Sequence, residues 1–256
     1  MCGRYVFDTD ADPVLVIMNY IEQRFGREWA AKIKTGEIFP ANSVPVLLTA
    51  EADPISVKKP GSDIKQQGGA LTAKERAKSI SVDKAQKQSS KIKSDQETQL
   101  QIKKESEIGG SSQLIALPMI WGFPGFRGSQ MLINARQETV EEKTIFRDSY
   151  KTRRCVIPTT GFFEWSHDDK GKSEDKFRFN VSKSPMVFLA GIYTWIDQEM
   201  RFVILTTAAN SSMADIHDRQ PVILPRQMIR PWISDLTAAD KLRQAAGPQM
   251  IKTLIK

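Results

Sequence analysis

The sequence predicts an α+β domain in which a curled, barrel-like and mainly antiparallel sheet is flanked by helices. Short apolar runs bounded by turn residues follow one another through the middle of the chain, whereas helical spacing of apolar residues appears towards its two ends. Strands grouped in this way argue against repeated βαβ units. With 256 residues, 40% of them hydrophobic, the chain is long enough to bury one sizeable core. We therefore expect a single domain over residues 2–256, interrupted by an insertion at about 52–113.

The first half of the domain should hold one helix and one strand pair. The helix is expected to begin at Asp12 as the N-cap, with Pro13 at the first helical position. Apolar residues then recur at helical spacing as far as Ile21. A strand at Val44–Leu48 is expected to pair with a strand at Leu114–Trp121 across the insertion.

The second half alternates short elements and ends in helices. A short strand at Met131–Ala135 and a helix near Glu138–Phe146 come first. Apolar runs typical of strands follow at Cys155–Ile157, Phe162–Trp165, Phe177–Val181, Met186–Trp195 and Phe202–Thr207. The closing helices are expected at Pro225–Ile233 and Thr237–Ala246, the latter opening with a box-like cap formed by Thr-Ala-Ala-Asp.

The insertion differs from the rest of the chain in composition. No aromatic residue occurs from Pro40 to Ile120, and Lys58–Ser112 is dominated by Lys, Gln, Ser, Glu and Gly. Such a segment buries too little apolar surface to offset the entropy lost on ordering. It carries about four of the seven excess positive charges of the chain. We interpret it as a flexible excursion, either simply solvated or serving as a basic tether for DNA.

Composition also limits the partners. A net charge of +7 and a pI near 9.3 permit a polyanionic partner without requiring one. The apolar runs are shorter than 18 residues and the N-terminus lacks the pattern of a signal peptide, so we expect a cytoplasmic protein without a membrane partner. Two cysteines and two histidines lack ligand spacing, so neither a metal nor another cofactor is expected. Cys155 should be a buried small hydrophobe.

Cys2 follows the initiator methionine directly. Because its side chain is small, we expect Met1 to be removed, which makes Cys2 the N-terminal residue. It would then carry a thiol with a pKa of about 8.5 and an α-amine with a pKa of about 7.7–8.0 on adjacent carbons. Such an aminothiol condenses with an aldehyde through its amine and closes a five-membered thiazolidine ring through its sulfur.

Four strings place polar residues in apolar, turn-rich surroundings. They are Cys2-Gly3-Arg4, Asn134-Ala135-Arg136, Phe163-Glu164-Trp165 and His217-Asp218-Arg219-Gln220-Pro221. Asn134 and Arg136, two positions apart on a strand, should share one face. Each string also has a purely structural interpretation. Glu164 could point to water from a strand, His217 could cap a turn, and Asn134 could satisfy backbone groups in a tight bend.

Taken together and in this order, the strings resemble the SRAP family (SOS-response-associated peptidase), as do Pro40 in its turn and Trp121-Gly122. The resemblance spans residues 2 to about 224, apart from the insertion. It implies the SRAP fold and covalent capture of abasic sites in single-stranded DNA by a nucleoid-associated protein. The chain departs from the family in its long insertion, in its C-terminus after Asp235, and in Glu37, where many relatives have asparagine. These departures bear on DNA affinity and on the extent of the binding groove.

The resemblance assigns a chemical role to four residues. Cys2 is the nucleophile that forms a thiazolidine with the ring-opened deoxyribose aldehyde. Glu164, between two aromatic residues that would desolvate it and raise its pKa, is expected to move protons on and off oxygen near neutral pH. His217 is expected to exchange protons with the sugar or the intermediate. Asn134 should fix the geometry of the reacting groups.

The same resemblance implies a set of DNA contacts that position the strand without reading its sequence. Arg4, Arg136 and Arg219 should face phosphates beside the lesion, where guanidinium groups bind well. Phe126 can stack on a base. The remaining expected contacts are Pro40, which would wedge against bases, Thr206, which would bond a phosphate, and Trp165.

Two other classes of function stay open at the level of sequence. In a thiol peptidase acting on proteins, Cys2, His217 and Asn134 would form a Cys-His-Asn arrangement. We expect the peptidase behaviour implied by the family name to be self-processing that exposes Cys2. In a non-catalytic single-strand binder, only the arginines and Phe126 would act.

Overall fold

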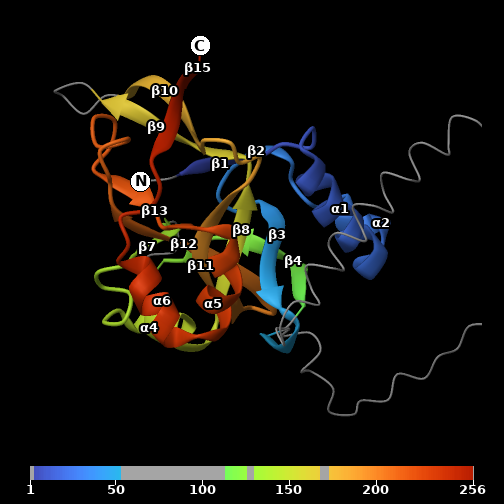
Figure 1. Cartoon of the computed structure of the whole chain (residues 1–256). Helices are drawn as coiled ribbons and strands as arrows, with labels where there is room; N and C mark the ends of the chain where they lie inside the picture. The colour runs from blue at the N-terminus through green and yellow to red at the C-terminus, as the bar shows by residue number, and fades with distance from the viewer. Residues whose placement is uncertain (1–2, 53–112, 126–129, 168–172, 256) are drawn as a thin grey trace, which may run out of the picture. The chain divides into compact units, whose positions relative to one another are not determined.

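The computed structural model describes residues 3–52, 113–125, 130–167 and 173–255 (Figure 1). Its centre is a barrel that five strands close, because β12 pairs with both β4 and β11 while β3 and β8 complete the ring. Only the β12–β4 pairing within this ring is parallel. The five strands are β3 (Ser43–Thr49), β4 (Leu114–Trp121), β8 (Arg154–Thr159), β11 (Val187–Ile196) and β12 (Glu199–Ala208). The predicted α+β class with a barrel-like, mainly antiparallel sheet is confirmed.

Short strands extend the barrel at its rim. Next to β12 lie β7 (Asn134–Arg136), which runs parallel to it, and β13 (Arg219–Pro221), which runs antiparallel. Next to β11 lies β14 (Ile223–Leu224). A separate two-stranded ribbon pairs β5 (Phe123–Pro124) with β6 (Met131–Leu132).

A second sheet is open and antiparallel throughout. Its strand order is β15 (Met250–Ile255), β10 (Ser173–Val181), β9 (Gly161–His167), β1 (Arg4–Phe7) and β2 (Gly36–Ile38). The chain passes from barrel strand β8 into β9 at a corner that is tied to β1. There the Thr159 hydroxyl donates to the Val6 carbonyl at 2.6 Å, and the Thr160 amide donates to the same oxygen at 2.9 Å. This corner sets the position of β9 against β1.

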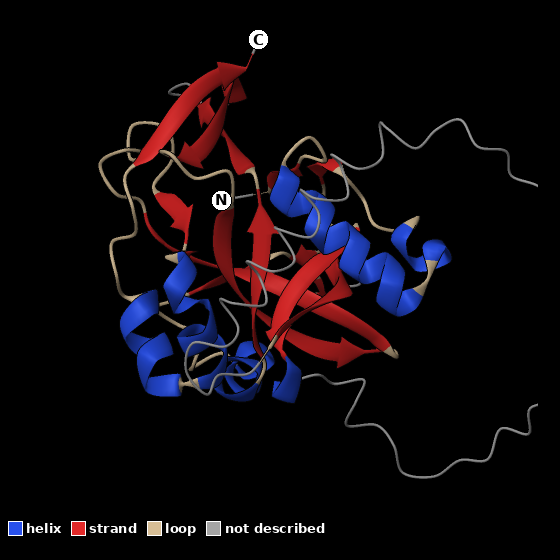
Figure 2. Cartoon of the chain, turned by 45° about the vertical axis from the view of Figure 1, so that its right-hand side comes forward, coloured by secondary structure: helices blue, strands red, loops and turns tan. Residues whose placement is uncertain are grey.

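The helices lie around the strands (Figure 2). The N-terminal pair precedes β2, and the other three lie beside the barrel. The helical segments are α1 (Asp12–Phe25), α2 (Arg27–Ala30), α4 (Thr144–Thr152), α5 (Ile229–Ser234) and α6 (Leu236–Arg243), with single 3-10 turns at Ala50–Ala52 and Arg226–Met228. Within the described part of the chain, no helix combines the length and apolar character needed to cross a membrane.

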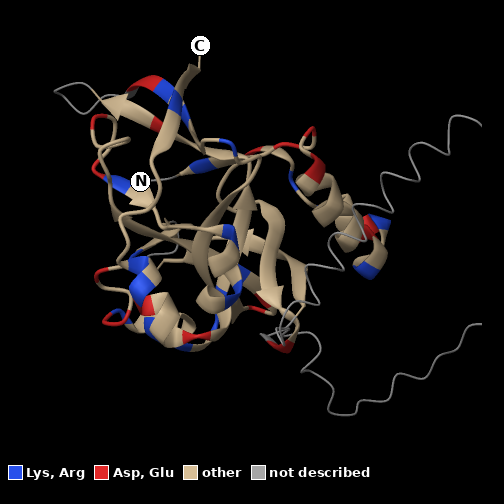
Figure 3. Ribbon diagram, in the orientation of Figure 1, with Lys and Arg blue, Asp and Glu red and all other residues tan. Residues whose placement is uncertain are grey.

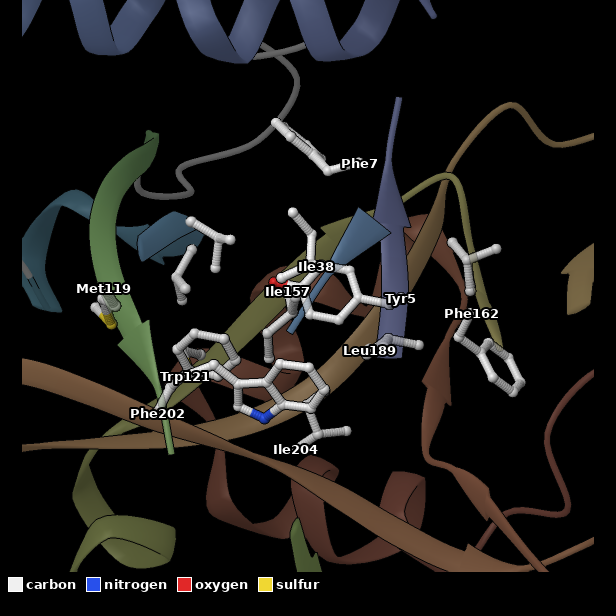
Figure 4. Close-up of a cluster of buried hydrophobic side chains, with 14 of the residues drawn as sticks. Tyr5, Phe7, Ile38, Met119, Trp121, Ile157, Phe162, Leu189, Phe202 and Ile204 are labelled. Atoms are coloured by element: carbon white, nitrogen blue, oxygen red, sulfur yellow. The ribbon is translucent and has the colours of Figure 1, made fainter. Parts of the chain in front are cut away.

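The barrel strands supply two separate apolar clusters from their alternating faces. One joins the barrel to the second sheet, and in it the Tyr5 ring of β1 lies 5.1 Å from the Trp121 ring (Figure 4). Trp121 in turn stacks against Phe202 of β12 at 6.4 Å. The other cluster includes Phe146, Tyr150 and further side chains of helices α4 to α6. Burial of these aromatic rings therefore holds β1 against the barrel.

The two strands that flank the insertion are paired as predicted. Their register runs from Ser43 opposite Ile120 to Thr49 opposite Leu114. The insertion therefore leaves and re-enters the domain at neighbouring strand ends. Residues 53–112, which make up most of the predicted insertion, lie outside the described residues.

The structure corrects several predicted boundaries. Ala11, not Asp12, precedes the first helix, because its carbonyl accepts the Val14 amide at 2.9 Å and Asp12 is already helical. The cap of α6 is Asp235, whose carboxylate accepts the amides of Thr237 and Ala238, rather than the Thr-Ala-Ala-Asp box.

Other predicted elements shift or were missed. Residues 137–142 form turns, so the helix expected there begins only at Thr144. The strand expected at Met131–Ala135 is interrupted at Ile133 and splits into β6 and β7. The C-terminal strand β15 was not predicted, although its register with β10 covers six residue pairs.

Candidate active site beside the first strand

Glu164 carries a buried carboxyl group. Although it is far from the N-terminus in sequence, its strand lies beside β1, the first strand of the chain. Its side chain belongs to β9 and the residue is only 3% exposed. The β1–β9 register pairs Arg4 with Phe163, and the next pair in that register would be Gly3 with Glu164. Burial raises the pKa of Glu164 to about 7. The predicted burial is confirmed, and the alternative of a solvent-facing strand residue is excluded.

Two predicted site residues, Cys2 and Phe126, lie outside the described residues. Gly3 is described and precedes β1 directly. The position of β1 is fixed on both sides, because β9 pairs with one edge and β2 with the other.

His217 lies in the turn before β13. Its Nδ1 accepts the Arg219 amide at 2.9 Å, and the Asp218 carboxylate lies 2.8 Å from the same nitrogen. Nδ1 cannot accept from the amide and donate to the carboxylate at once. Burial lowers the pKa of His217, so at neutral pH the ring is neutral, Nδ1 accepts, and the proton resides on Nε2. His217 thus caps its turn through Nδ1.

The turn that carries His217 lies beside the end of β9, the strand that carries Glu164. His167, three residues after Glu164 on β9, presents its ring edge-on to His217 with the ring centroids 6.4 Å apart. The negative charge of Asp218 also contributes to the raised pKa of Glu164, after burial. The chain has only two histidines, and the fold places them side by side.

Asn134 and Arg136 occupy β7 as the sequence predicts. They flank Ala135, which is fully buried in the helix-facing cluster, so both side chains point to the opposite face. Asn134 is half-buried and Arg136 is exposed. The Trp121 indole donates to the Ile133 carbonyl at 3.0 Å. Because Trp121 also contacts Tyr5, one side chain fixes both β7 and β1.

The Arg219 side chain forms an ion pair with Glu138 of the same chain. Its guanidinium binds both carboxylate oxygens of Glu138, at 2.7 and 2.9 Å, and donates to the Thr206 carbonyl at 2.8 Å. The hydrogen bond from Arg219 lowers the pKa of Glu138. Thr206 is fully buried. A phosphate contact by Arg219 would therefore require Glu138 to move away, and one by Thr206 would require this buried residue to become accessible.

Arg4 lies between two aromatic rings. Its guanidinium carbon is 4.6 Å from the Phe39 ring centroid and 4.9 Å from that of Trp165. Pro40 is half-buried in the turn that follows Phe39. The Arg4 guanidinium also donates to Glu37 at 3.2 Å. Sequence reasoning placed Arg4, Pro40 and Trp165 among the DNA contacts, and the structure gathers them at the β1–β2 side of the second sheet.

Lys176 is a cation that sequence reasoning missed. It lies on β10, where acidic and basic residues are mixed (Figure 3), and its Nζ is 4.0 Å from the Phe163 ring centroid. The same Nζ donates to both carboxylate oxygens of Glu37, at 2.8 and 2.9 Å. One signal in the sequence could have identified it. Polar and apolar residues alternate along this strand, with Lys176, Arg178 and Asn180 two positions apart, which predicts one polar face.

Comparisons with known proteins agree with these features. The sequence is 37% identical over 123 residues to the abasic site processing protein YoaM of Bacillus subtilis, covering 46% of this chain and 54% of that protein. It is 32% identical over 121 residues to the abasic site processing protein YedK of Escherichia coli, covering 45% and 54%. The chain spans about half the length of these curated relatives.

Solved structures show the same fold. A phage-related protein of Bordetella bronchiseptica superposes with a TM-score of 0.58 at 18% identity, covering 100% of this chain and 94% of that one. A second protein of Bordetella bronchiseptica gives a TM-score of 0.58 at 15% identity, with complete coverage of both chains. The pattern that defines the family of the SOS response associated peptidase (SRAP) matches residues 1–254. The chain therefore belongs to the SRAP family.

Proposed function

We propose that this protein captures abasic sites in single-stranded DNA through a covalent bond to Cys2, after removal of Met1. The observation that carries the proposal is Glu164, a buried carboxyl group with a pKa of about 7 next to the strand that begins at Arg4. Relatives named abasic site processing proteins in bacteria support the choice of substrate.

Covalent connection limits how far Cys2 can be from Glu164. Consecutive Cα atoms are about 3.8 Å apart, so the Cα of Cys2 is within about 7.6 Å of the Cα of Arg4. Arg4 pairs with Phe163, the residue before Glu164. Covalent connection therefore keeps Cys2 near this end of the β1–β9 pair, and the proposal requires its amine and thiol to reach the Glu164 carboxyl group.

The proposed reaction has two stages. The sugar first opens: the C1′–O4′ bond breaks, O4′ takes a proton, and the C1′ hydroxyl loses its proton to become an aldehyde. The Cys2 amine then adds to C1′ and water leaves, which gives an imine. The thiol sulfur adds to the imine carbon while its proton passes to nitrogen, closing the thiazolidine with net loss of one water. Glu164 is suited to give and take the protons on oxygen because its pKa lies near neutrality.

The neighbouring residues support these steps. The Nε2–H of neutral His217 can exchange a proton with the sugar hydroxyls, and Asn134 can orient the N-terminus or the sugar. Exposed Arg136 and the Arg4 group are placed to bind phosphates without reading sequence. Phe126 is proposed to stack on a base.

Two finer activities belong to the same proposal. An imine at C1′ allows loss of the C2′ proton and departure of the 3′ phosphate, which is the lyase reaction. Self-processing that removes the residue before Cys2 accounts for the peptidase behaviour in the family name.

The test is a denaturing gel with a single-stranded oligonucleotide that carries one abasic site. The wild-type protein should form a heat-stable adduct whose mass equals that of the DNA plus the protein without Met1, minus one water. Cys2→Ala should form none. Cys155→Ala is the matched control, because Cys155 is fully buried and burial raises the pKa of its thiol, and it should form the adduct normally.

Three outcomes would overturn the proposal. An adduct formed by Cys2→Ala, or by protein that retains Met1, would exclude the aminothiol. Degradation of casein without an adduct would instead indicate a general thiol peptidase. Retention of the oligonucleotide on a native gel only would indicate a non-covalent binder.

Removal of the insertion should leave capture intact. Because Thr49 lies opposite Leu114, a four-residue Gly/Ser/Asn turn replacing residues 53–112 can join the flanking segments without disturbing the barrel. We expect the adduct to form at a rate within about threefold of wild type, measured by the same gel over time. A deletion variant with native circular dichroism and no adduct would show that the insertion contributes to the site.

A further inference from the structure

Arg4 and Lys176 share one carboxylate and one aromatic ring. Glu37 accepts hydrogen bonds from both cations, and the Trp165 ring centroid lies 4.9 Å from the Arg4 guanidinium carbon and 5.5 Å from the Lys176 Nζ. The cations come from β1 and β10, which lie on opposite sides of β9. The sheet therefore brings two like charges together on the face of β9 that carries Phe163 and Trp165, opposite to the face of Glu164.

The pair is accessible from solvent. The side chains of Arg4 and Lys176 are 40% and 22% exposed, and that of Glu37 is 31% exposed. Phe39, on the other side of Arg4, is 39% exposed. Two cations beside the exposed Phe39 ring and the half-buried Trp165 ring form a combination that suits single-stranded nucleic acid, with phosphate on the charges and a base on a ring.

We propose that Arg4 and Lys176 form one phosphate subsite for single-stranded DNA, and that Glu37 occupies this subsite as a carboxylate stand-in until the strand displaces it. The inference rests on the proposed function for the identity of the ligand. It adds Lys176 as a DNA-binding residue and makes Glu37 an internal competitor that lowers affinity for DNA.

Exchange of Glu37 for a phosphate is favoured by the geometry. Glu37 lies on a three-residue edge strand, and its half-exposed carboxylate can swing into water. The ion pair is partly exposed, so water can replace part of what the Glu37 carboxylate loses when it leaves the cations. A phosphodiester has the same unit charge as the carboxylate and offers acceptor oxygens to both cations at once.

The experiment measures binding of an intact fluorescent single-stranded oligonucleotide, without an abasic site, by polarisation at several salt concentrations. Glu37→Gln should bind about threefold to tenfold more tightly than wild type, because the carboxylate that competes with phosphate for both cations is removed. Lys176→Gln should bind about threefold to tenfold more weakly, and the slope of log affinity against log salt should become shallower by about 0.7, as for loss of one phosphate contact.

Matched controls come from an exposed ion pair that joins the last turns of α1 to the start of α2. Glu22 and Arg27 are joined at 2.8 Å, and Glu22→Gln and Arg27→Gln change the net charge by the same amounts as the two test variants. Both controls should bind like wild type. In the Lys176→Gln background, Glu37→Gln should gain less affinity than it does alone, since the two residues are coupled.

Either of two results would overturn the inference. One is a Glu37→Gln variant that binds no more tightly than Glu22→Gln, and the other is a Lys176→Gln variant that binds no more weakly than Arg27→Gln. Because the oligonucleotide has no aldehyde, failure of covalent capture would leave this test unaffected. If the wild-type protein forms the adduct and both test variants bind DNA like their matched controls, the subsite is rejected and the proposed function stands.

Discussion

Replacing Glu164 with glutamine is expected to slow adduct formation by about a hundredfold or more, the range typical for loss of a general acid–base group. Glutamine has nearly the same shape but cannot donate a proton to O4′ or accept one from the sugar hydroxyl. The rate is measured with protein in excess over an abasic oligonucleotide, following the heat-stable adduct on a denaturing gel. Glu142→Gln, which alters an exposed glutamate in a turn, should react at the wild-type rate.

The pH dependence of the same rate identifies the proton donor. Protonated Glu164 is lost as pH rises through about 7, whereas the free amine of Cys2 accumulates as pH rises towards about 8. The wild-type rate should therefore be bell-shaped with its maximum between these values. In Glu164→Gln the falling limb should disappear, leaving a rate that rises to a plateau as the amine loses its proton. A falling limb that persists in the variant would assign the acid to another group.

Measurements of unfolding free energy and of DNA affinity distinguish an acid–base role of Glu164 from a structural role. A carboxyl group whose pKa is raised by folding destabilises the native state as pH increases from its ordinary 4.5 to about 7, by roughly 3 kcal/mol in all. Glu164→Gln should lack that fall in stability when urea unfolding is measured across this pH range. Its non-covalent affinity for an intact strand should match wild type. Equal losses in binding and capture would contradict an acid–base role.

The barrel could be predicted from sequence because its strands carry their own signal. Each consists of a short apolar run with turn residues at its ends, and the β3–β4 pair could be identified across the insertion. A helix was predicted to begin near Glu138 because the residues there are helix formers, but residues 137–142 fold into turns. Those turns place Glu138 against Arg219, a contact between residues 81 positions apart. Local propensity does not register such a tertiary contact.

The residue types of the candidate site could be predicted from the sequence, but the charged residues that they contact could not. Glu164 is buried as predicted, but not by its two aromatic neighbours in sequence, because Phe163 and Trp165 point to the opposite face of β9. The carboxylate that binds Arg4 and Lys176 could not be inferred from neighbouring residues, since Glu37 is 33 residues from Arg4 and 139 residues from Lys176. Their meeting depends on the strand order of the second sheet, which a single sequence does not specify. Arg4 and Arg219 were expected to face phosphates, and in the structure they bind the carboxylates of Glu37 and Glu138.

Arg154 is expected to be among the most sensitive positions for stability. It is 5% exposed, and its guanidinium donates to the carbonyls of Tyr150 and Lys151 in α4 and of Trp232 and Ile233 in α5, at 2.7 to 3.0 Å. These carbonyls belong to the last turns of their helices, where they have no partner within the helix and carry partial negative charge. The buried cation is thus balanced by two helix ends rather than by a carboxylate.

Arg154→Met should therefore lower the free energy of unfolding by about 3–5 kcal/mol, because it leaves several buried acceptors unsatisfied at once. Arg154→Lys keeps the charge but loses the planar fork, so its loss should be about half as large. Arg153→Met is the matched control; Arg153 is half-buried and bonds Ser149 and the Tyr193 carbonyl, and its replacement should lower the free energy by about 1 kcal/mol. Urea unfolding with unchanged m values gives all three differences. A loss for Arg154→Met no greater than that for Arg153→Met would mean that water satisfies the helix ends, and that α4 and α5 are held to the barrel by their apolar faces alone.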